Sequence, residues 1–197
     1  TTLSATGQDV FHTTFMPFTE GFCHVPANDT DAMLAALTDD VCAVMLEFVQ
    51  GEGGVTPATE EFMKGVRQLC DEKNLIMICD EVQCGMGRLG TRFAFQSFGV
   101  VPDAISMAKA IANGLPMGAM VISRKYATVL KAGEHASTFG GTPLVSAAAL
   151  ATLEAIENEN MLENCRTIGA YLMDKLAEVG KKYKCVQCVR GRGLMIG

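Results

Sequence analysis

Short apolar runs alternate with amphipathic segments along most of the chain, and this alternation constrains the fold more than any other feature. Four runs predict strands: Val41 to Val49, Leu75 to Cys79, Ala104 to Ala108 and Met117 to Ser123. Continuous apolar runs of this length are typical of strands that are buried on both faces. The order of the segments predicts an α/β fold, a mostly parallel sheet with helices on both faces.

Helix signals lie between and after these runs. Asn28 or Asp29 is suited to cap a short helix that runs through Leu37. Thr59 is suited to begin a second helix, which has a continuous apolar face. Thr142 and Pro143 are predicted to be the N-cap and first residue of a long helix. A further amphipathic helix is predicted from apolar residues that recur every three or four positions: Met161, Cys165, Ile168, Leu172, Leu176 and Val179. This helix is expected to end at Gly180. A new sheet is expected to begin in the segment from Val186 to Ile196.

Lys109 is the only charged residue between Ala104 and Ser123. A lysine in apolar surroundings loses its charge readily, and a neutral amine is what Schiff-base chemistry needs. The alternative is a lysine that extends its ammonium group to water from an apolar segment. This stretch alone leaves both interpretations open.

Asp80 ends the apolar run that begins at Leu75, and Glu81 follows it directly. In open α/β sheets, ligands bind just outside the carboxyl ends of the strands, where Asp80 is expected to lie. A lysine for a Schiff base and a carboxylate for a pyridinium nitrogen are the two protein groups that pyridoxal phosphate (PLP) chemistry requires. The alternative role for Asp80 is a cap at a strand end.

Glycine-rich segments follow two of the predicted strands, Gly51 to Gly54 and Gly85 to Gly90. The second contains a GxGxxG pattern, but no acidic residue about 20 positions later ends a following strand, which argues against a dinucleotide site. These glycines are expected to allow tight turns and a close approach to a ligand. Ser137 and Thr138 precede Gly140 and offer a phosphate-binding turn, or an ordinary turn into the next helix.

Composition excludes several classes of protein. The formal net charge is −6 and no basic stripe is present, which argues against nucleic-acid binding. No apolar run is long enough to predict a membrane span. The chain contains eight cysteines, several of them in apolar runs (Cys42, Cys70, Cys79 and Cys165), which is typical of a reduced, cytoplasmic protein. Cys185 and Cys188 form a lone C-x-x-C pair, no metal site is predicted, and His24 and His135 are interpreted as structural.

Four motifs together resemble the class III (fold type I) PLP-dependent aminotransferases. They are EFVQGEGGVTPA from Glu47, DEVQCGMGRLG from Asp80, PDAISMAKAIANGLPMGA from Pro102 and HASTFGGTPL from His135. The opening LSATGQ and the stretch FTEGFCHVPANDTDAMLAAL resemble the acetylornithine aminotransferase subgroup. The departures Phe48, Leu89 and Thr142 stand where the family usually has proline, threonine and asparagine.

The resemblance implies a role for each matching residue at the cofactor. Lys109 matches the lysine that forms the Schiff base with PLP and then moves the substrate proton. Asp80 matches the carboxylate that keeps the pyridine nitrogen protonated. Val82 matches the residue that packs on the ring, and Gln83 the one that hydrogen-bonds the ring hydroxyl.

Other matches concern the phosphate, the substrate and the partner subunit. Thr138, with Ser137 beside it, matches a threonine that reaches the cofactor phosphate of a neighbouring subunit, so the resemblance implies a homodimer with shared active sites. Glu52 matches a glutamate on the substrate side, and Glu47 a nearby acidic position of undefined role.

The resemblance also implies that the sequence corresponds to the middle of a longer family member. Residues 1–183 then represent part of the PLP-binding large domain, and 184–197 the start of the C-terminal small domain. The segments that supply a phosphate-binding turn and a substrate-binding arginine are expected outside it, so this chain is expected to have little or no activity.

Three functions remain open. The first is transamination between an N-acetylornithine-type donor and 2-oxoglutarate, in arginine biosynthesis. The second is another class III transamination, of ornithine, 4-aminobutyrate or a β-amino acid. The third is a non-catalytic remnant of the large domain.

Overall fold

The computed structural model describes residues 1–197, which form two compact units, Thr1–Val41 and Cys42–Gly197. The division predicted near residue 183 stays a prediction, and the chain from Lys184 to Gly197 belongs to the second unit.

The first unit contains three short helices, α1 (Thr2–Ala5), the 3₁₀ helix η1 (Asp9–His12) and α2 (Thr30–Ala36). The predicted helix at α2 is confirmed, with Asp29 as its N-cap: the Asp29 carboxylate accepts a hydrogen bond of 2.8 Å from the Ala32 amide. The His24 ring lies 3.3 Å from the Ala5 carbonyl oxygen, a contact that fits its predicted structural role.

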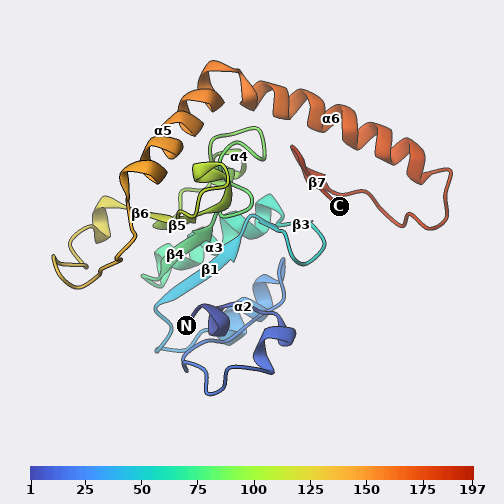
Figure 1. Ribbon diagram of the computed structural model, residues 1–197. Coiled ribbons are helices and arrows are strands. Elements are labelled where there is room, and N and C mark those ends of the chain that lie inside the picture. Colours follow the sequence, from blue (N-terminus) through green and yellow to red (C-terminus); the bar gives the residue numbers. More distant parts are fainter. The chain divides into compact units, whose positions relative to one another are not determined.

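The second unit is built on a four-stranded sheet (Figure 1). The strands β1 (Ala43–Glu47), β4 (Ile76–Asp80), β5 (Ala104–Met107) and β6 (Ala119–Ile122) lie in that order. Neighbours β1, β4 and β5 run parallel, and β6 is antiparallel to β5. The predicted mostly parallel α/β fold is confirmed.

The first predicted strand was wrong in its extent and burial. The run from Val41 to Val49 divides at Phe48: β1 ends at Glu47, and β2 (Val49–Gln50) pairs with β3 (Thr56–Pro57) in a separate antiparallel hairpin. Met45 is 52% exposed, because β1 is an edge strand and this side chain lies on the face away from helix α3.

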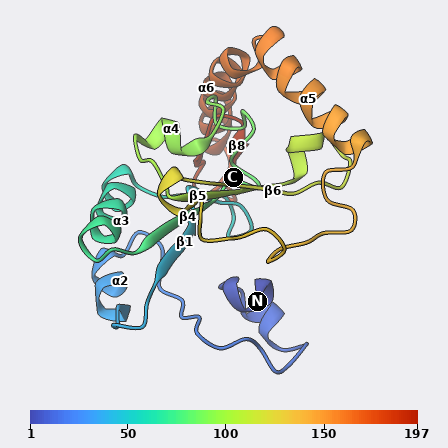
Figure 2. The ribbon, with the colours of Figure 1, turned by 90° about the vertical axis from the view of Figure 1, so that its left-hand side faces the viewer.

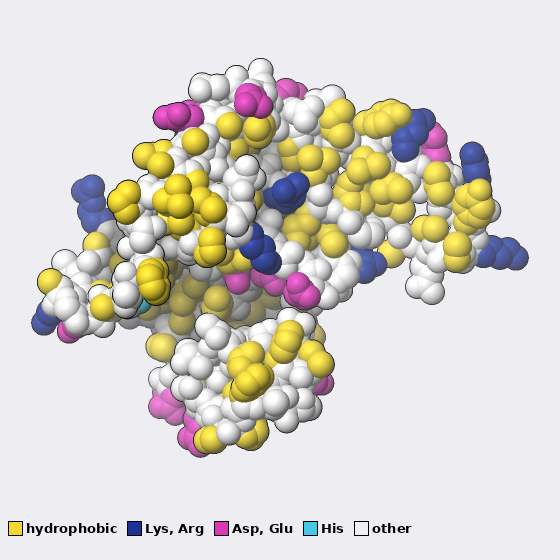
Figure 3. Space-filling view, viewed as in Figure 1, with side chains coloured by type: hydrophobic (Ala, Val, Ile, Leu, Met, Phe, Trp, Pro, Cys, Tyr) yellow, Lys and Arg dark blue, Asp and Glu magenta, His cyan; other side chains and the backbone are white.

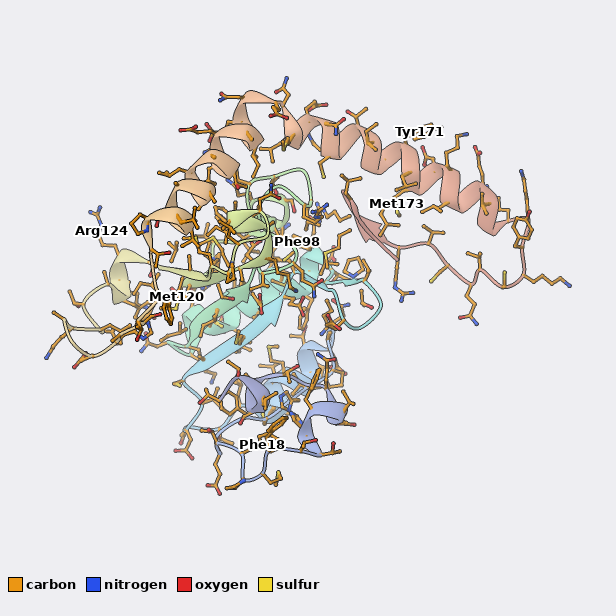
Figure 4. All side chains as sticks on the ribbon, viewed as in Figure 1. Phe18, Phe98, Met120, Arg124, Tyr171 and Met173 are labelled. Atoms are coloured by element: carbon orange, nitrogen blue, oxygen red, sulfur yellow. The ribbon has the colours of Figure 1, made fainter.

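Helix α3 (Glu60–Glu72) covers one face of the sheet (Figure 2). The Thr59 hydroxyl caps it by accepting a 3.1 Å hydrogen bond from the Phe62 amide, as predicted. Its apolar face is buried together with Met77 and Cys79 of β4: Phe62, Met63, Val66, Leu69 and Cys70. On the opposite face Ile76 and Ile78 are only half-buried, and Met120 of β6 is 59% exposed (Figure 4).

Two long helices follow the sheet, α5 (Pro143–Asn158) and α6 (Met161–Gly180). Thr142 and Pro143 occupy the predicted N-cap and first helical positions of α5. The apolar stripe of α6 is mostly exposed, since only Cys165 and Gly169 are buried on this helix, and hydrophobic side chains lie at the surface around α5 and α6 (Figure 3). No helix combines the length and the apolar character that crossing a membrane requires.

The C-terminal hairpin, β7 (Gly191–Arg192) and β8 (Met195–Ile196), confirms the sheet predicted after Val186. It packs closely against α6, because Gly169 has no side chain to meet the Gly193 carbonyl. The Leu194 amide donates a 3.0 Å hydrogen bond to the Arg88 carbonyl. The hairpin therefore also contacts the loop that follows β4.

Candidate active site

Polar side chains gather where the parallel strands end. Strand pairing sets Glu47 of β1 beside Asp80 of β4, and Asp80 beside Ser106 of β5. Lys109 follows three residues after Ser106, and the charges of both Asp80 and Lys109 act on the Glu47 carboxyl. The fold thus brings the two sequence-predicted chemical groups together at the carboxyl edge of the sheet, where α/β proteins bind ligands.

Lys109 begins a short 3₁₀ helix, η2 (Lys109–Ala112), in an unusual backbone conformation. Its φ is 48°, in the left-handed region that costs a non-glycine residue about 1–2 kcal/mol. Ile111 and Ala112 are buried, and α5 packs against η2, so the surrounding structure holds this conformation. The side chain itself is exposed, so the amine is accessible. Strain of this kind clusters at functional sites.

Asp80 makes the capping contact that the sequence offered as one of its two roles, and its role at a pyridinium nitrogen stays a prediction. Its Oδ1 accepts a 2.8 Å hydrogen bond from the Val82 amide, which caps the turn after β4. The other oxygen, Oδ2, makes no hydrogen bond to the chain. The Cys84 thiol donates a 3.3 Å hydrogen bond to the Asp80 backbone carbonyl and so stabilises the turn after β4. A half-buried carboxylate with one free oxygen is suited to accept a hydrogen bond from a ligand.

Gln83 lies against the glycine-rich turn that follows β2. A Cβ atom on Gly51 would come within 2.5 Å of the Gln83 side-chain amide, so only glycine fits there. Val82 and Gln83 are both half-buried, whereas Glu52 is exposed in the turn. Gln83 of the second motif therefore contacts the turn of the first motif that carries Glu52.

Sequence reasoning did not identify Ser106 and gave Glu47 no definite role. The Ser106 hydroxyl oxygen is buried without a hydrogen-bond partner, and its signal in the sequence was one polar residue inside an apolar strand. Burial is the main cause that raises the pKa of Glu47, and the negative charge of Asp80 adds to it. The Gly51 amide and Lys109 act in the opposite direction.

Glu81, next to Asp80, is a structural residue. Its side chain is 1% exposed, and its two oxygens accept hydrogen bonds from the Ala94 amide (2.8 Å) and the Phe95 amide (3.0 Å). These amides begin helix α4 (Ala94–Phe98), so the carboxylate satisfies donors that the helix leaves free. Burial raises the pKa of Glu81, and the two amides oppose this rise.

We expect Glu81→Gln to lower the free energy of unfolding by about 1–3 kcal/mol. The side-chain nitrogen of glutamine would replace one carboxylate oxygen, and the backbone N–H that it faces would then have no acceptor. Burial raises the pKa of Glu81 in the folded state above its ordinary value. The stabilisation that Glu81 contributes is therefore complete at a pH below the ordinary pKa, and it is lost as the pH rises through the pKa of the folded state. The cost of the substitution should therefore be larger near about pH 4 than near about pH 7 in urea unfolding. A cost that grows with pH would contradict this account.

Ser137, Thr138 and His135 are exposed in the segment before α5. The Gly140 amide donates a 3.3 Å hydrogen bond to the Ser137 carbonyl, which forms the ordinary turn that the sequence allowed. No hydrogen bond joins these side chains to the Lys109 region. The phosphate-binding role of Ser137 and Thr138 stays a prediction.

The arginines of the second unit mostly have partners already. Arg92 pairs with Glu157 at 2.6 Å, Arg192 reaches Glu60 and stacks on Phe98, and Arg190 binds backbone carbonyls of the glycine-rich turn. A surface cavity of about 270 Å³ is lined by Arg92, Glu157, Asn160, Glu163 and Arg166 among others. It contains neither Lys109 nor Asp80, and its arginines face carboxylates.

All eight cysteines are free thiols. Cys70, Cys79 and Cys165 are buried as predicted, and burial raises the pKa of Cys70 to about 11. Cys42 was predicted to be buried and is exposed, because it precedes the edge strand β1. Cys185 and Cys188 are exposed, and no cluster of three or more potential metal ligands is present.

Comparison with known sequences agrees with the geometry of this site. The profile of the family described as "Aminotransferase class-III" matches residues 1–197. An acetylornithine aminotransferase of Caldanaerobacter subterraneus is 46% identical over 99% of this chain and 49% of its own length. The corresponding protein of Methanocaldococcus jannaschii is 47% identical over 100% of this chain and 50% of its own length. The chain thus spans about half the length of the curated relatives it matches.

Solved structures show the same relationship. The ornithine aminotransferase from Toxoplasma gondii, which was found with PLP at partial occupancy in its active site, superposes with a TM-score of 0.92. It is 34% identical over 98% of this chain and 46% of its own. The N-acetylornithine aminotransferase from Stenotrophomonas maltophilia gives a TM-score of 0.79 at 39% identity, over 90% of this chain and 47% of its own. Together with the lysine and aspartate at the sheet edge, these matches show that the chain belongs to the class III aminotransferases, which depend on PLP.

Proposed function

We propose that this chain carries the lysine and aspartate half of an acetylornithine-type aminotransferase site, which transfers an amino group from an N-acetylornithine-type donor to 2-oxoglutarate. The observation that carries the proposal is the placement of Lys109 and Asp80 at one edge of the sheet, with Lys109 exposed in a strained conformation. The identity of 46–47% to acetylornithine aminotransferases supports the choice of donor.

The residues present fit PLP. Asp80 offers a free carboxylate oxygen, and the neighbouring Ser106 hydroxyl is buried without a partner. Polar groups at this edge therefore have hydrogen-bonding capacity that the chain does not use and a ligand could. A primary amine and a carboxylate are the groups that an aldehyde on a pyridinium ring requires. When bound, PLP supplies the electron sink that makes the substrate Cα acidic.

Each residue then has a definite task. Lys109 holds the cofactor and moves the proton at the substrate Cα. Asp80, whose Oδ1 accepts from the Val82 amide, would keep a proton on the ring nitrogen with its remaining carboxylate oxygen. When PLP is bound, Val82 would pack on the ring, and the Gln83 amide would hydrogen-bond the ring hydroxyl. Glu52 lies toward the substrate.

The exposed Thr138 supports a homodimer in which the segment before α5 reaches the phosphate site of the partner. We place the protein in the reducing cytoplasm, as the buried thiols Cys70, Cys79, Cys84 and Cys165 support. Arginine biosynthesis is the corresponding pathway.

A second candidate donor is ornithine itself, because ornithine aminotransferases of Toxoplasma gondii and Plasmodium falciparum superpose with TM-scores of 0.92 and 0.84. The two donors differ at the amine that is not transferred, because the acetyl group removes its positive charge and adds an amide carbonyl and a methyl group.

The donor is tested by a single-turnover assay on a PLP-loaded full-length family member that contains this chain, in which loss of the lysine-bound absorption band follows amino transfer. We expect N-acetylornithine to convert the cofactor at least about tenfold faster than ornithine at equal concentration, which is about 1.4 kcal/mol of discrimination. Faster conversion by ornithine would assign the second donor. No conversion by either, with the cofactor bound at Lys109, would favour the non-catalytic alternative.

A further inference from the structure

We propose that Glu47 and Arg190 are positioning residues that hold the hairpin loop 51–55 from its two ends, and that this loop sets the places of Gln83 and Glu52. We call residues 51–55 the Gly51 turn. It links β2 to β3 and is closed by a 3.3 Å hydrogen bond from the Val55 amide to the Gly51 carbonyl. The proposal rests on the proposed function, which gives Gln83 and Glu52 their roles.

Glu47 holds the start of the turn. Its Oε2 accepts a 3.2 Å hydrogen bond from the Gly51 amide, and its backbone is paired with Asp80 in the sheet. One side chain therefore ties the turn to the strand end that carries Asp80. The charges of Asp80, Lys109 and Glu52 all act on this carboxyl, so Glu47 lies among the groups assigned to cofactor and substrate.

Arg190 holds the end of the turn. Its Nη2 donates to the Gly54 carbonyl at 2.7 Å, and its Nε lies 3.1 Å from both the Gly54 and Val55 carbonyls. The backbone of Arg190 is fixed in turn, because its N–H and C=O pair with Gly197 at 2.9 Å in both directions. A planar guanidinium that binds two neighbouring carbonyls defines both the position and the orientation of the backbone that carries them, here the end of the turn.

The Gly51 turn is in direct contact with one residue of the cofactor site. Gln83 lies on the Cα of Gly51 so closely that a Cβ atom there would clash with its amide group. Displacement of Gly51 therefore opens space for Gln83 to change rotamer. Glu52 is the next residue along, is exposed, and has only the turn backbone to place it.

This role of Arg190 differs from that of an arginine that binds the carboxylate of a substrate. Its Nε and Nη2 bind the turn carbonyls, and its Nη1 lies 2.9 Å from the Cys188 sulfur. All three nitrogens of the guanidinium are thus engaged within the chain. The residue acts on the site through the turn rather than by touching a substrate.

The test compares Glu47→Ala with Glu47→Gln, and Arg190→Met with Arg190→Lys. Two quantities are measured: deuterium exchange of the peptide that covers residues 49–57, and the dissociation constant for PLP, with borohydride fixation to identify the lysine. Exposed residues remote from the turn, Glu154→Gln on α5 and Arg124→Met (Figure 4), serve as matched controls.

We expect Glu47→Ala and Arg190→Met to speed exchange in this peptide and to weaken PLP binding about tenfold each, or about 1.4 kcal/mol. Glu47→Gln should stay within about twofold of the wild type, because its amide oxygen still accepts from Gly51. Arg190→Lys should be intermediate, since an ammonium lacks the planar fork. The double variant Glu47→Ala, Arg190→Met should lose less than the product of the single effects, because both act on one turn.

Faster exchange with unchanged PLP affinity would overturn the positioning role, and so would equal losses in Glu47→Gln and Glu47→Ala. Failure of the proposed function has a separate signature: the wild-type protein would then attach no PLP at Lys109. The exchange rates of the variants would still decide whether Glu47 and Arg190 hold the turn.

Discussion

Replacement of Lys109 by alanine is expected to abolish covalent attachment of PLP. The wild-type protein with PLP should develop an absorption band in the near-ultraviolet to blue region, and borohydride should fix the cofactor to the peptide that contains Lys109. Lys109 is the lysine whose charge acts on the Glu47 carboxyl at this strand edge, so Lys109→Ala should show neither the band nor the label. Lys73→Ala, at the exposed end of α3, is the control and should behave as the wild type.

Lys109→Gly separates loss of the amine from loss of the fold. Glycine accepts a φ of 48° without strain, so this variant should unfold at the same or a slightly higher denaturant concentration than the wild type. It should nevertheless fail to bind PLP covalently. Labelling of another lysine while Lys109 stays unmodified would refute the assignment.

In a full-length family member that contains this chain, Asp80→Asn is expected to retain PLP but to lower turnover by about a thousandfold, which is about 4 kcal/mol of barrier. An amide cannot keep a proton on the ring nitrogen, so the negative charge that forms at the substrate Cα is less well stabilised. The cap to the Val82 amide survives, because the asparagine oxygen still accepts that hydrogen bond. The fold should therefore be preserved while catalysis is lost.

The measurement is the rate of amino transfer at saturating donor, with PLP occupancy checked by absorbance. Asp80→Glu should lose less than Asp80→Asn, because it keeps a carboxylate near the ring. Asp174→Asn, on the exposed side of α6, should leave the rate unchanged. A rate for Asp80→Asn close to that of the wild type would exclude the electrostatic role.

Local signals in the sequence were sufficient for most of the secondary structure. Asp29 and Thr59 cap their helices through hydrogen bonds that involve only residues three positions away. The apolar face of α3 followed from its period. The parallel sheet followed from apolar runs separated by a helix, because a crossover connection favours parallel strands.

The sequence failed where burial depended on neighbouring elements. The run from Val41 to Val49 looks like one buried strand, yet Phe48 is where the backbone leaves the sheet and Met45 lies on an open face. The stripe on α6 has the period of a buried face and is largely exposed. Periodicity shows which residues share a face, but only the arrangement of other elements decides whether that face is covered.

The sequence by itself determined the chemistry: one isolated lysine, one aspartate after an apolar run, and the motifs that resemble a PLP enzyme. These are properties of residue type and local order. The tertiary structure alone decided that Glu47, Asp80 and Ser106 lie side by side, since strand register is set by pairing between distant segments. It alone joined the Gly51 turn to Gln83 and to Arg190, over separations of more than a hundred residues in the case of Arg190. Such contacts leave no mark on local sequence, because they depend on how the chain returns on itself in space.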